Sequence, residues 1–366
     1  MDGLLFAPPL LQRVMRILEL SDEDFFRRTL PKGEVDFFYV GGSPRKYEDC
    51  RMTRAAFRQV RAELETGRYD LIACSVNPLP LWRAERGVLR NVAQLAGRFV
   101  RRPHSLTLSR LPSLNRAGVP VLVYNRKDAP ILPRQNFVLL QHCTRFFIRE
   151  LPQNNWNLFL FTSSKSEDVV NITKQAIFKD NIGKIRPMPL GFEIPLDDYL
   201  PFAETKTSDV FYAGRNHSST VRSKGLTQIE ELRKLGYRVD IPDAPLPREE
   251  FLRRCAAAHI VWSPEGLGWD CHRHYEALLV GSVPLINTPT IERYHPLEHG
   301  KHCLYYSIEG TSLVDTVREA LKKPELLREI SRQGREHILH WHRHEAVVRY
   351  MIEETLSAAP PRAPRG

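Results

Sequence analysis

Residues 263–284 (SPEGLGWDCHRHYEALLVGSVP) hold the side chains whose types and spacing best suit a phosphorylated ligand. Gly266 and Gly268 allow a backbone to approach a ligand with no side chain in between. A helix is expected to begin just after them, and a helix start offers free N–H groups and a positive dipole end to a phosphate. Polar side chains fall at or near its first turns: Asp270, His272, Arg273 and Glu276.

Each of these residues has a functional interpretation and an ordinary one. Arg273 can make a two-pronged, charge-assisted contact with a diphosphate, and Glu276 can accept hydrogen bonds from sugar or ribose hydroxyls. Alternatively, Arg273 and Glu276 form a surface ion pair. Asp270 either caps the helix or contacts the ligand, and His272 is equally consistent with an ordinary loop histidine. A glycine-rich loop alone is a weak signal, so the surrounding elements matter.

Apolar runs and helical spacing alternate along the chain and predict an α/β protein. In the first half we expect helices over 10–30, 53–65 and 88–99, and strands over 35–40, 69–75, 120–124 and 157–162. Residues 137–148 are compatible with a strand, a helix or both. In the second half we expect strands over 209–213, 237–241, 259–263 and 283–286, and helices over 227–235, 249–257, 272–279, 313–322 and 325–356.

This alternation favours parallel sheets with right-handed crossovers, arranged as two Rossmann-like domains whose strand carboxyl ends face a shared cleft. The Pro- and Gly-rich stretch 185–195 and the polar stretch 196–207 mark the boundary. The predicted divisions are 1–200, a first Rossmann-like domain; 201–345, a second Rossmann-like domain; and 346–366, a helix end with a disordered tail.

The run Pro-x-Gly-x-Gly-x-Asp-x-x-Arg-x-x-Glu-Ala-Leu-x-x-Gly-x-Val-Pro, from Pro264 to Pro284, resembles the donor-site segment of the exostosin-like glycosyltransferases. It is also similar to the glycosyltransferases grouped with bacterial spore-maturation proteins. Both groups have the GT-B fold. The resemblance implies that Arg273 serves the phosphates of a nucleotide-sugar donor and that Glu276 serves its ribose or sugar hydroxyls.

The resemblance extends more weakly over about residues 208–345. Residues 211–215 (FYAGR) look like the first strand and loop of a donor domain, with Arg215 and Asn216 facing the cleft. A second phosphate contact is expected from Arg222 or Lys224, and the sequence does not choose between them. By family habit the donor is a UDP-sugar, bound as a substrate, with no cofactor and no metal; no Asp-x-Asp occurs in a plausible donor loop.

One departure from the pattern concerns the stereochemistry. Many retaining GT-B enzymes carry two glutamates separated by seven residues, but the place of the first, counted back from Glu276, is Gly268. Asp270 or Glu265 could substitute, and inverting transfer is slightly favoured. An inverting enzyme needs a general base on the acceptor hydroxyl, normally from the first domain. The candidates are Asp128, ranked first because it follows a predicted strand end, His142 and Glu193.

Bulk properties narrow the class of protein. The 366 residues carry a formal charge of +10, spread without a long basic run, and no nucleic-acid motif is recognisable. Six widely spaced cysteines predict free thiols. No run of about 18 apolar residues predicts a membrane span, and Asp2, Pro8 and Pro9 argue against a signal peptide, so we expect a cytoplasmic enzyme.

Two alternatives to the transferase remain: a nucleotide-sugar epimerase of the same fold, and a basic non-catalytic binder of polysaccharide or nucleic acid. The C-terminal histidines are predicted to form a solvated helix face without a metal, although two of them, His340 and His344, would share one face of the expected helix; the set is His337, His340, His342 and His344.

Overall fold

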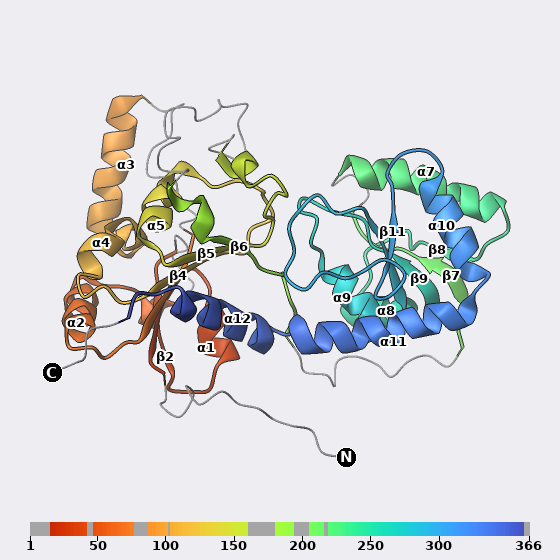
Figure 1. Ribbon diagram of the computed structural model, residues 1–366. Helices are drawn as coiled ribbons and strands as arrows, with labels where there is room; N and C mark the ends of the chain where they lie inside the picture. Colours follow the sequence, from red (N-terminus) through yellow and green to blue (C-terminus); the bar gives the residue numbers. More distant parts are fainter. Residues whose placement is uncertain are drawn as a thin grey trace, which may run out of the picture.

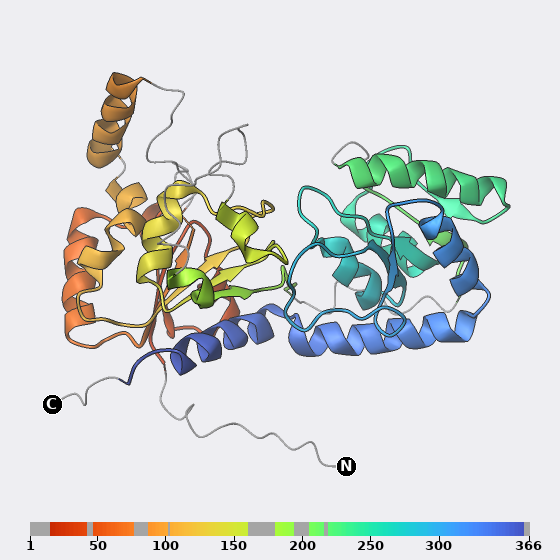
Figure 2. The same ribbon diagram turned by 45° about the horizontal axis from the view of Figure 1, so that its top comes forward.

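The computed structural model describes residues 15–41, 47–76, 87–101, 103–159, 180–193, 205–215 and 219–361. These residues form two α/β domains, each built on a parallel sheet, which lie side by side in both views (Figures 1 and 2). None of the helices in these ranges combines the length and the apolar character that crossing a membrane requires.

The first domain contains a six-stranded sheet with the order β2-β1-β3-β4-β5-β6. Its strands are β1 (Ile17–Ser21), β2 (Val35–Tyr39), β3 (Leu71–Ser75), β4 (Val121–Asn125), β5 (Arg145–Ile148) and β6 (Ile185–Pro187). Its α-helices are α1 (Phe25–Thr29), α2 (Arg54–Glu65), α3 (Val88–Arg101), α4 (Leu111–Leu114) and α5 (Phe137–His142). The central strands β1, β3 and β4 are buried along their whole length, because both faces of the parallel sheet are covered.

The second domain contains a five-stranded parallel sheet with the order β11-β10-β9-β7-β8. Its strands are β7 (Ser208–Phe211), β8 (Val239–Asp240), β9 (Ala258–Trp262), β10 (Val283–Asn287) and β11 (Leu304–Tyr306). Its helices are α7 (Thr220–Lys234), α8 (Arg248–Ala256), α9 (His272–Leu279), α10 (Ser312–Leu321) and α11 (Pro324–Trp341).

Both sheets reverse their strand order at an equivalent place. The first strand of each domain lies between the second and the third: β1 between β2 and β3, and β7 between β8 and β9. Ligands of open α/β sheets bind beyond the carboxyl ends of the strands at such a switch point. The topology therefore directs attention to the loops that follow β7 and β9.

The last helix, α12 (His344–Ser357), belongs by packing to the first domain. Val347, Met351 and Ile352 are buried in one apolar cluster with Leu122 of β4 and Phe147 of β5. Figure 1 shows α11 along the second domain and α12 under the first sheet. The chain thus begins and ends its folded part in the same domain.

Several predicted elements differ from the structure. Residues 17–21 (ILELS), expected in a helix, form the strand β1, whose five residues are all buried, Glu19 and Ser21 included. The apolar spacing through Ile17 and Leu18 fitted a helix, and nothing local in the sequence indicates that Glu19 is buried. Residues 155–159 form a 3₁₀ helix where a strand was predicted to begin, and 137–148 contain both α5 and β5. The predicted boundary near residue 200 lies outside the described residues.

The C-terminal histidines are the clearest correction. The helix predicted over 325–356 is two helices, with α11 ending at Trp341 and α12 beginning at His344, so His340 and His344 do not share one helix. His342 and His344 are buried at the break, so a solvated face is wrong for these two. All six cysteines are free, as predicted.

Candidate functional site

The loop between β9 and α9, residues 263–271, is the centre of the site and is called the glycine loop below. It leaves the middle strand of the second sheet at the switch point and is folded on itself by a hydrogen bond from Gly266 N to Gly268 O of 2.9 Å. Helix α9 follows directly, with Cys271 as its N-cap residue. The predicted order of strand, glycine-containing loop and helix is confirmed.

Arg273 lies beneath this loop and spans the switch point. Its Nη1 donates to the carbonyl of Ala213, after β7, at 2.7 Å, and its Nη2 donates to the carbonyl of Pro264, after β9, at 3.3 Å. The residue is 9% exposed, and its buried Nε has no hydrogen-bond partner. The guanidinium is therefore directed at two backbone carbonyls, which fixes the separation of the two loops.

In the part of the chain that the structure describes, no carboxylate neutralises the charge of Arg273. No ion pair among the described residues includes Arg273, and burial, with Arg222 as a like-charged neighbour, lowers the pKa of its guanidinium. The surface ion pair predicted with Glu276 is not formed, because Glu276 pairs instead with Arg248 at 3.1 Å. A buried cation at the start of α9 makes this point of the fold attractive to an anion.

Arg222, near the start of α7, supports the other side of the loop. Its Nε donates to Glu265 O at 2.9 Å, and its Nη1 donates to Arg215 O at 3.0 Å. A Cβ on Gly266 would lie 2.8 Å from its Nη2, so a side chain there would displace the end of Arg222. Lys224, on the same helix, is exposed and makes no hydrogen bond or ion pair with the loop among the described residues. Of the two predicted candidates, the structure brings Arg222 to the loop.

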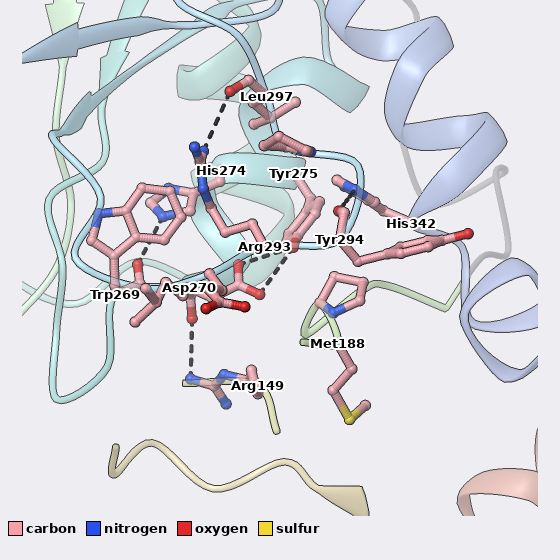
Figure 3. A pocket seen from close by; sticks show the side chains of 14 residues that line it. Arg149, Met188, Trp269, Asp270, His274, Tyr275, Arg293, Tyr294, Leu297 and His342 are labelled. Carbon is pink, nitrogen blue, oxygen red and sulfur yellow. Dashed lines mark hydrogen bonds between the residues drawn. The ribbon is translucent and has the colours of Figure 1, made fainter. Parts of the chain in front are cut away.

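The remaining predicted donor residues are placed unevenly. Arg215 is exposed after β7, and Asn216 lies outside the described residues. Asp270 is buried, and its carboxylate accepts from Tyr275 Oη at 2.9 Å (Figure 3). It also accepts from Leu190 N at 2.6 Å, and it does not cap α9. His272 is exposed at the helix start, where partial desolvation lowers its pKa.

The predicted general bases lie at different distances from this loop. Asp128 follows β4 and its carboxylate accepts from Arg149 Nη2, which also donates to Asp270 O at 3.0 Å, so Asp128 is beside the glycine loop. Glu193 forms a half-exposed ion pair with Arg28 at 3.6 Å. His142 ends α5 and precedes β5, which puts it at the amino edge of the sheet, opposite the loop.

A cavity of about 390 Å³ lies between the domains on the β10 side of the glycine loop. The first domain contributes Ile131, Glu150 and Asn157 to its wall, and the second contributes Glu265, Gly268 and Thr290, among others. Asn287 Nδ2 donates to the Glu265 carboxylate at 3.0 Å and so fixes its direction. Burial raises the pKa of Glu150 to about 7, against the lowering effect of Arg149.

No family model matches the chain, and no curated protein matches it. It is similar to the structure of a glycosyltransferase from Rickettsia africae, at 9% identity over 94% of this chain and 98% of that chain, with a TM-score of 0.54. The chain has the GT-B fold. An alpha-glucosyltransferase solved with UDP and a 13-mer DNA containing a central A:G mismatch is also similar, at 10% identity over 93% of this chain and 100% of that chain, with a TM-score of 0.50.

At these identities the comparisons concern the fold alone. They confirm the predicted class, two Rossmann-like domains of the GT-B kind, while the narrower exostosin-like resemblance stays a prediction. In the GT-B frame, the glycine loop and α9 belong to the second domain, and Asp128 and Arg149 approach them from the first.

Sequence reasoning missed Arg149 and Glu150. Both contact the glycine loop, and both directly follow the buried strand β5. A pair of charged residues at the carboxyl end of an apolar run was a usable signal, of the same kind that singled out Asp128. The signal is obscured because the sequence of residues 137–148 fits a strand and a helix equally well, so the end of β5 is not evident from it.

Proposed function

We propose that the protein transfers a sugar from a nucleoside-diphosphate sugar to an acceptor hydroxyl. One observation carries the proposal: Arg273 is a buried cation without a carboxylate partner among the described residues, at the start of α9 and across the β7/β9 switch point. A diphosphate at the helix start would supply the missing negative charge and accept from the free N–H groups there. The GT-B fold agrees with this use of the second domain.

The sugar and the acceptor are assigned to the interdomain cavity. Pockets that enclose small ligands commonly have volumes of about 300–1,000 Å³, and this cavity, at about 390 Å³, has polar groups from both domains on its wall. Glu276, on the second turn of α9, is assigned to ribose or sugar hydroxyls, with Arg248 as its partner. The nucleotide is proposed to be UDP, which agrees with the family resemblance and with the UDP bound to the alpha-glucosyltransferase.

The proposed chemistry is a metal-independent, inverting displacement. The acceptor oxygen attacks the anomeric carbon while the bond from that carbon to the phosphate oxygen breaks, and the electron pair leaves with the diphosphate. The N-terminus of α9 and the charge of Arg273 stabilise the negative charge that grows on the leaving group. Asp128 is proposed to accept the proton of the acceptor hydroxyl, and its ion pair with Arg149, which contacts the glycine loop, supports this choice among the candidate bases.

A ligand screen tests the donor site. Nucleoside diphosphates and nucleotide sugars are added to the wild type, to Arg273→Ala and to Arg328→Ala, a control that removes an arginine 75% exposed on α11. A ligand that binds the native state raises the melting temperature by mass action. We expect one nucleotide to stabilise the wild type and the control but not Arg273→Ala. If no nucleotide stabilises the folded wild type, the proposal is wrong.

Product analysis separates the transferase from its alternatives. With the stabilising nucleotide sugar, an epimerase forms a new nucleotide sugar when no acceptor is present, whereas a transferase releases nucleoside diphosphate in proportion to glycosylated acceptor. A non-catalytic polyanion binder gives neither product, and its affinity falls steeply with salt.

A further inference from the structure

Glu150 is a first-domain residue whose carboxylate is bound to the glycine loop of the second domain. It is 1% exposed, and its two oxygens accept from Trp269 N at 2.8 Å, from Asp270 N at 3.2 Å and from Arg149 Nε at 3.1 Å. Trp269 and Asp270 are the two loop residues before the N-cap of α9. A carboxylate that accepts two consecutive backbone N–H groups fixes the orientation of both peptide planes.

Gly268 shows how closely the two domains approach here. A Cβ on this residue would lie 2.6 Å from the Glu150 carboxyl carbon and 3.0 Å from Asp128 O, so any side chain would force the loop and Glu150 apart. Arg149 adds a hydrogen bond to Asp270 O at 3.0 Å. Residues 268–270 are therefore held by groups of the first domain.

The first part of the loop has different supports. The carbonyls of Pro264 and Glu265 accept from Arg273 and Arg222, both of the second domain. The two domains also contact each other beside the loop through bonds that do not involve it. Glu292 N donates to Leu151 O at 2.7 Å, and Gln153 N donates to Thr290 O at 3.3 Å. Glu150 is thus not needed to bring the domains together, and its contacts act on the shape of the loop.

We propose that Glu150 is a positioning residue that gives the glycine loop its donor-binding shape when the two domains are together. The inference rests on the proposed function, because it assigns the loop to the donor. Without Glu150, the loop would sample other shapes, and a smaller fraction of the molecules would have the shape that binds the donor. The apparent dissociation constant of the donor would rise in inverse proportion to that fraction. The site for the donor is then completed by a residue of the acceptor-side domain.

The first test measures the loop itself and needs no ligand. Amide hydrogen exchange of peptides covering residues 264–271 is compared among the wild type, Glu150→Ala, Glu150→Gln, Gly268→Ala and the control Gln153→Ala, which removes only the interdomain bond from Gln153 Nε2 to Pro289 O. Loss of a hydrogen bond to a charged group should speed exchange by about tenfold or more in Glu150→Ala and Gly268→Ala. Glu150→Gln keeps one acceptor oxygen and should be intermediate. Exchange like that of the wild type in folded Glu150→Ala overturns the proposal.

The second test measures the consequence for the donor. With UDP as the probe, Glu150→Ala and Gly268→Ala should weaken binding by roughly tenfold, and the donor KM should rise while kcat at saturating donor stays within about twofold. Gln153→Ala should bind UDP like the wild type. If Glu150→Ala does not fold, Glu150→Gln and Gly268→Ala carry the comparison. Faster loop exchange with unchanged UDP affinity overturns the positioning role, whereas a wild type that binds no nucleotide refutes the proposed function and leaves the exchange result standing.

Discussion

Replacing Gly225, in α7, by alanine should lower the free energy of unfolding. The same replacement of an ordinary glycine inside a helix raises it. A Cβ on Gly225 would lie 2.8 Å from Cη2 of Trp262 and would overlap Cζ2. The indole is fully buried, and its Nε1 donates to Tyr306 Oη at 2.9 Å, so the ring cannot turn aside without losing that bond. Gly97, in α3, offers the matched control, because a Cβ there would meet no atom within 4 Å.

The two competing effects can be compared in magnitude. Replacing a helix-interior glycine by alanine stabilises by up to about 1 kcal/mol. Overpacking of a tight core costs about 1–3 kcal/mol, and a lost buried hydrogen bond costs roughly another 1 kcal/mol. Gly225→Ala should therefore lower the free energy of unfolding by about 1–3 kcal/mol, whereas Gly97→Ala should raise it by up to about 1 kcal/mol.

Urea denaturation of the two variants and the wild type tests this reasoning, with each domain's transition fitted separately because a two-domain chain need not unfold in one step. Gly225→Ala should also weaken nucleotide binding, since α7 carries Ser219, whose Oγ donates to Glu265 O at 3.0 Å, as well as Arg222. If the transition midpoint of Gly225→Ala equals or exceeds that of the wild type while Gly97→Ala is stabilised, the packing argument fails.

Three further outcomes are expected. Asp128→Asn should lower kcat by about 100-fold or more if the carboxylate is the general base, and near-normal turnover of a folded variant would exclude that role. Glu276→Gln should raise the KM of the donor more than the KM of the acceptor, because Glu276 is assigned to donor hydroxyls. Steady-state kinetics with each substrate varied in turn measures both constants. Burial lowers the pKa of His274 to about 4 and that of His342 to about 3, so the unfolded chain binds more protons below their ordinary value of 6.5. His344 behaves in the same way, whereas burial raises the pKa of Glu19 and of Glu150 to about 7, so these two carboxyls bind protons in the folded chain over the same range. Three histidines against two carboxyls leave about one net proton, so stability should fall as the pH drops from about 6 to about 5, by roughly 1–1.5 kcal/mol per pH unit, and urea midpoints that rise over that range would contradict this.

The second domain was predicted more accurately than the first. Helix α9 was predicted with the bounds that the structure shows, because glycine-containing turns flank it and its apolar spacing is regular. Strand β1 was missed because Ile17 and Leu18 continue a helix-like apolar spacing, and because Glu19, which is buried in the strand, gives no sign of burial in the sequence. The break between α11 and α12 carries no proline or glycine, and it arises from packing of α12 against the other domain.

The site was predicted by residue type more reliably than by role. Arg273 was singled out as a phosphate contact, which stays a prediction. Its burial and its hydrogen bonds to Ala213 O and Pro264 O were not foreseen, because they depend on where β7 lies, about 60 residues away in sequence. Glu150 meets residues about 120 positions later in the chain. No local pattern encodes contacts of this range, because they exist only after both sheets have formed and met.

The return of α12 to the first sheet has a consequence for how the protein is made. The first domain leaves the ribosome early, but its apolar surface over Leu122 and Phe147 is covered by Val347 and Met351, which are translated last. At about 5–20 residues per second, roughly 10–30 s pass between the end of the first sheet and the synthesis of its final helix. During that interval the nascent chain exposes an incomplete core, which makes it a substrate for chaperones. Chains truncated before residue 344 should fail to fold their first domain, even though the domain that carries the glycine loop is complete.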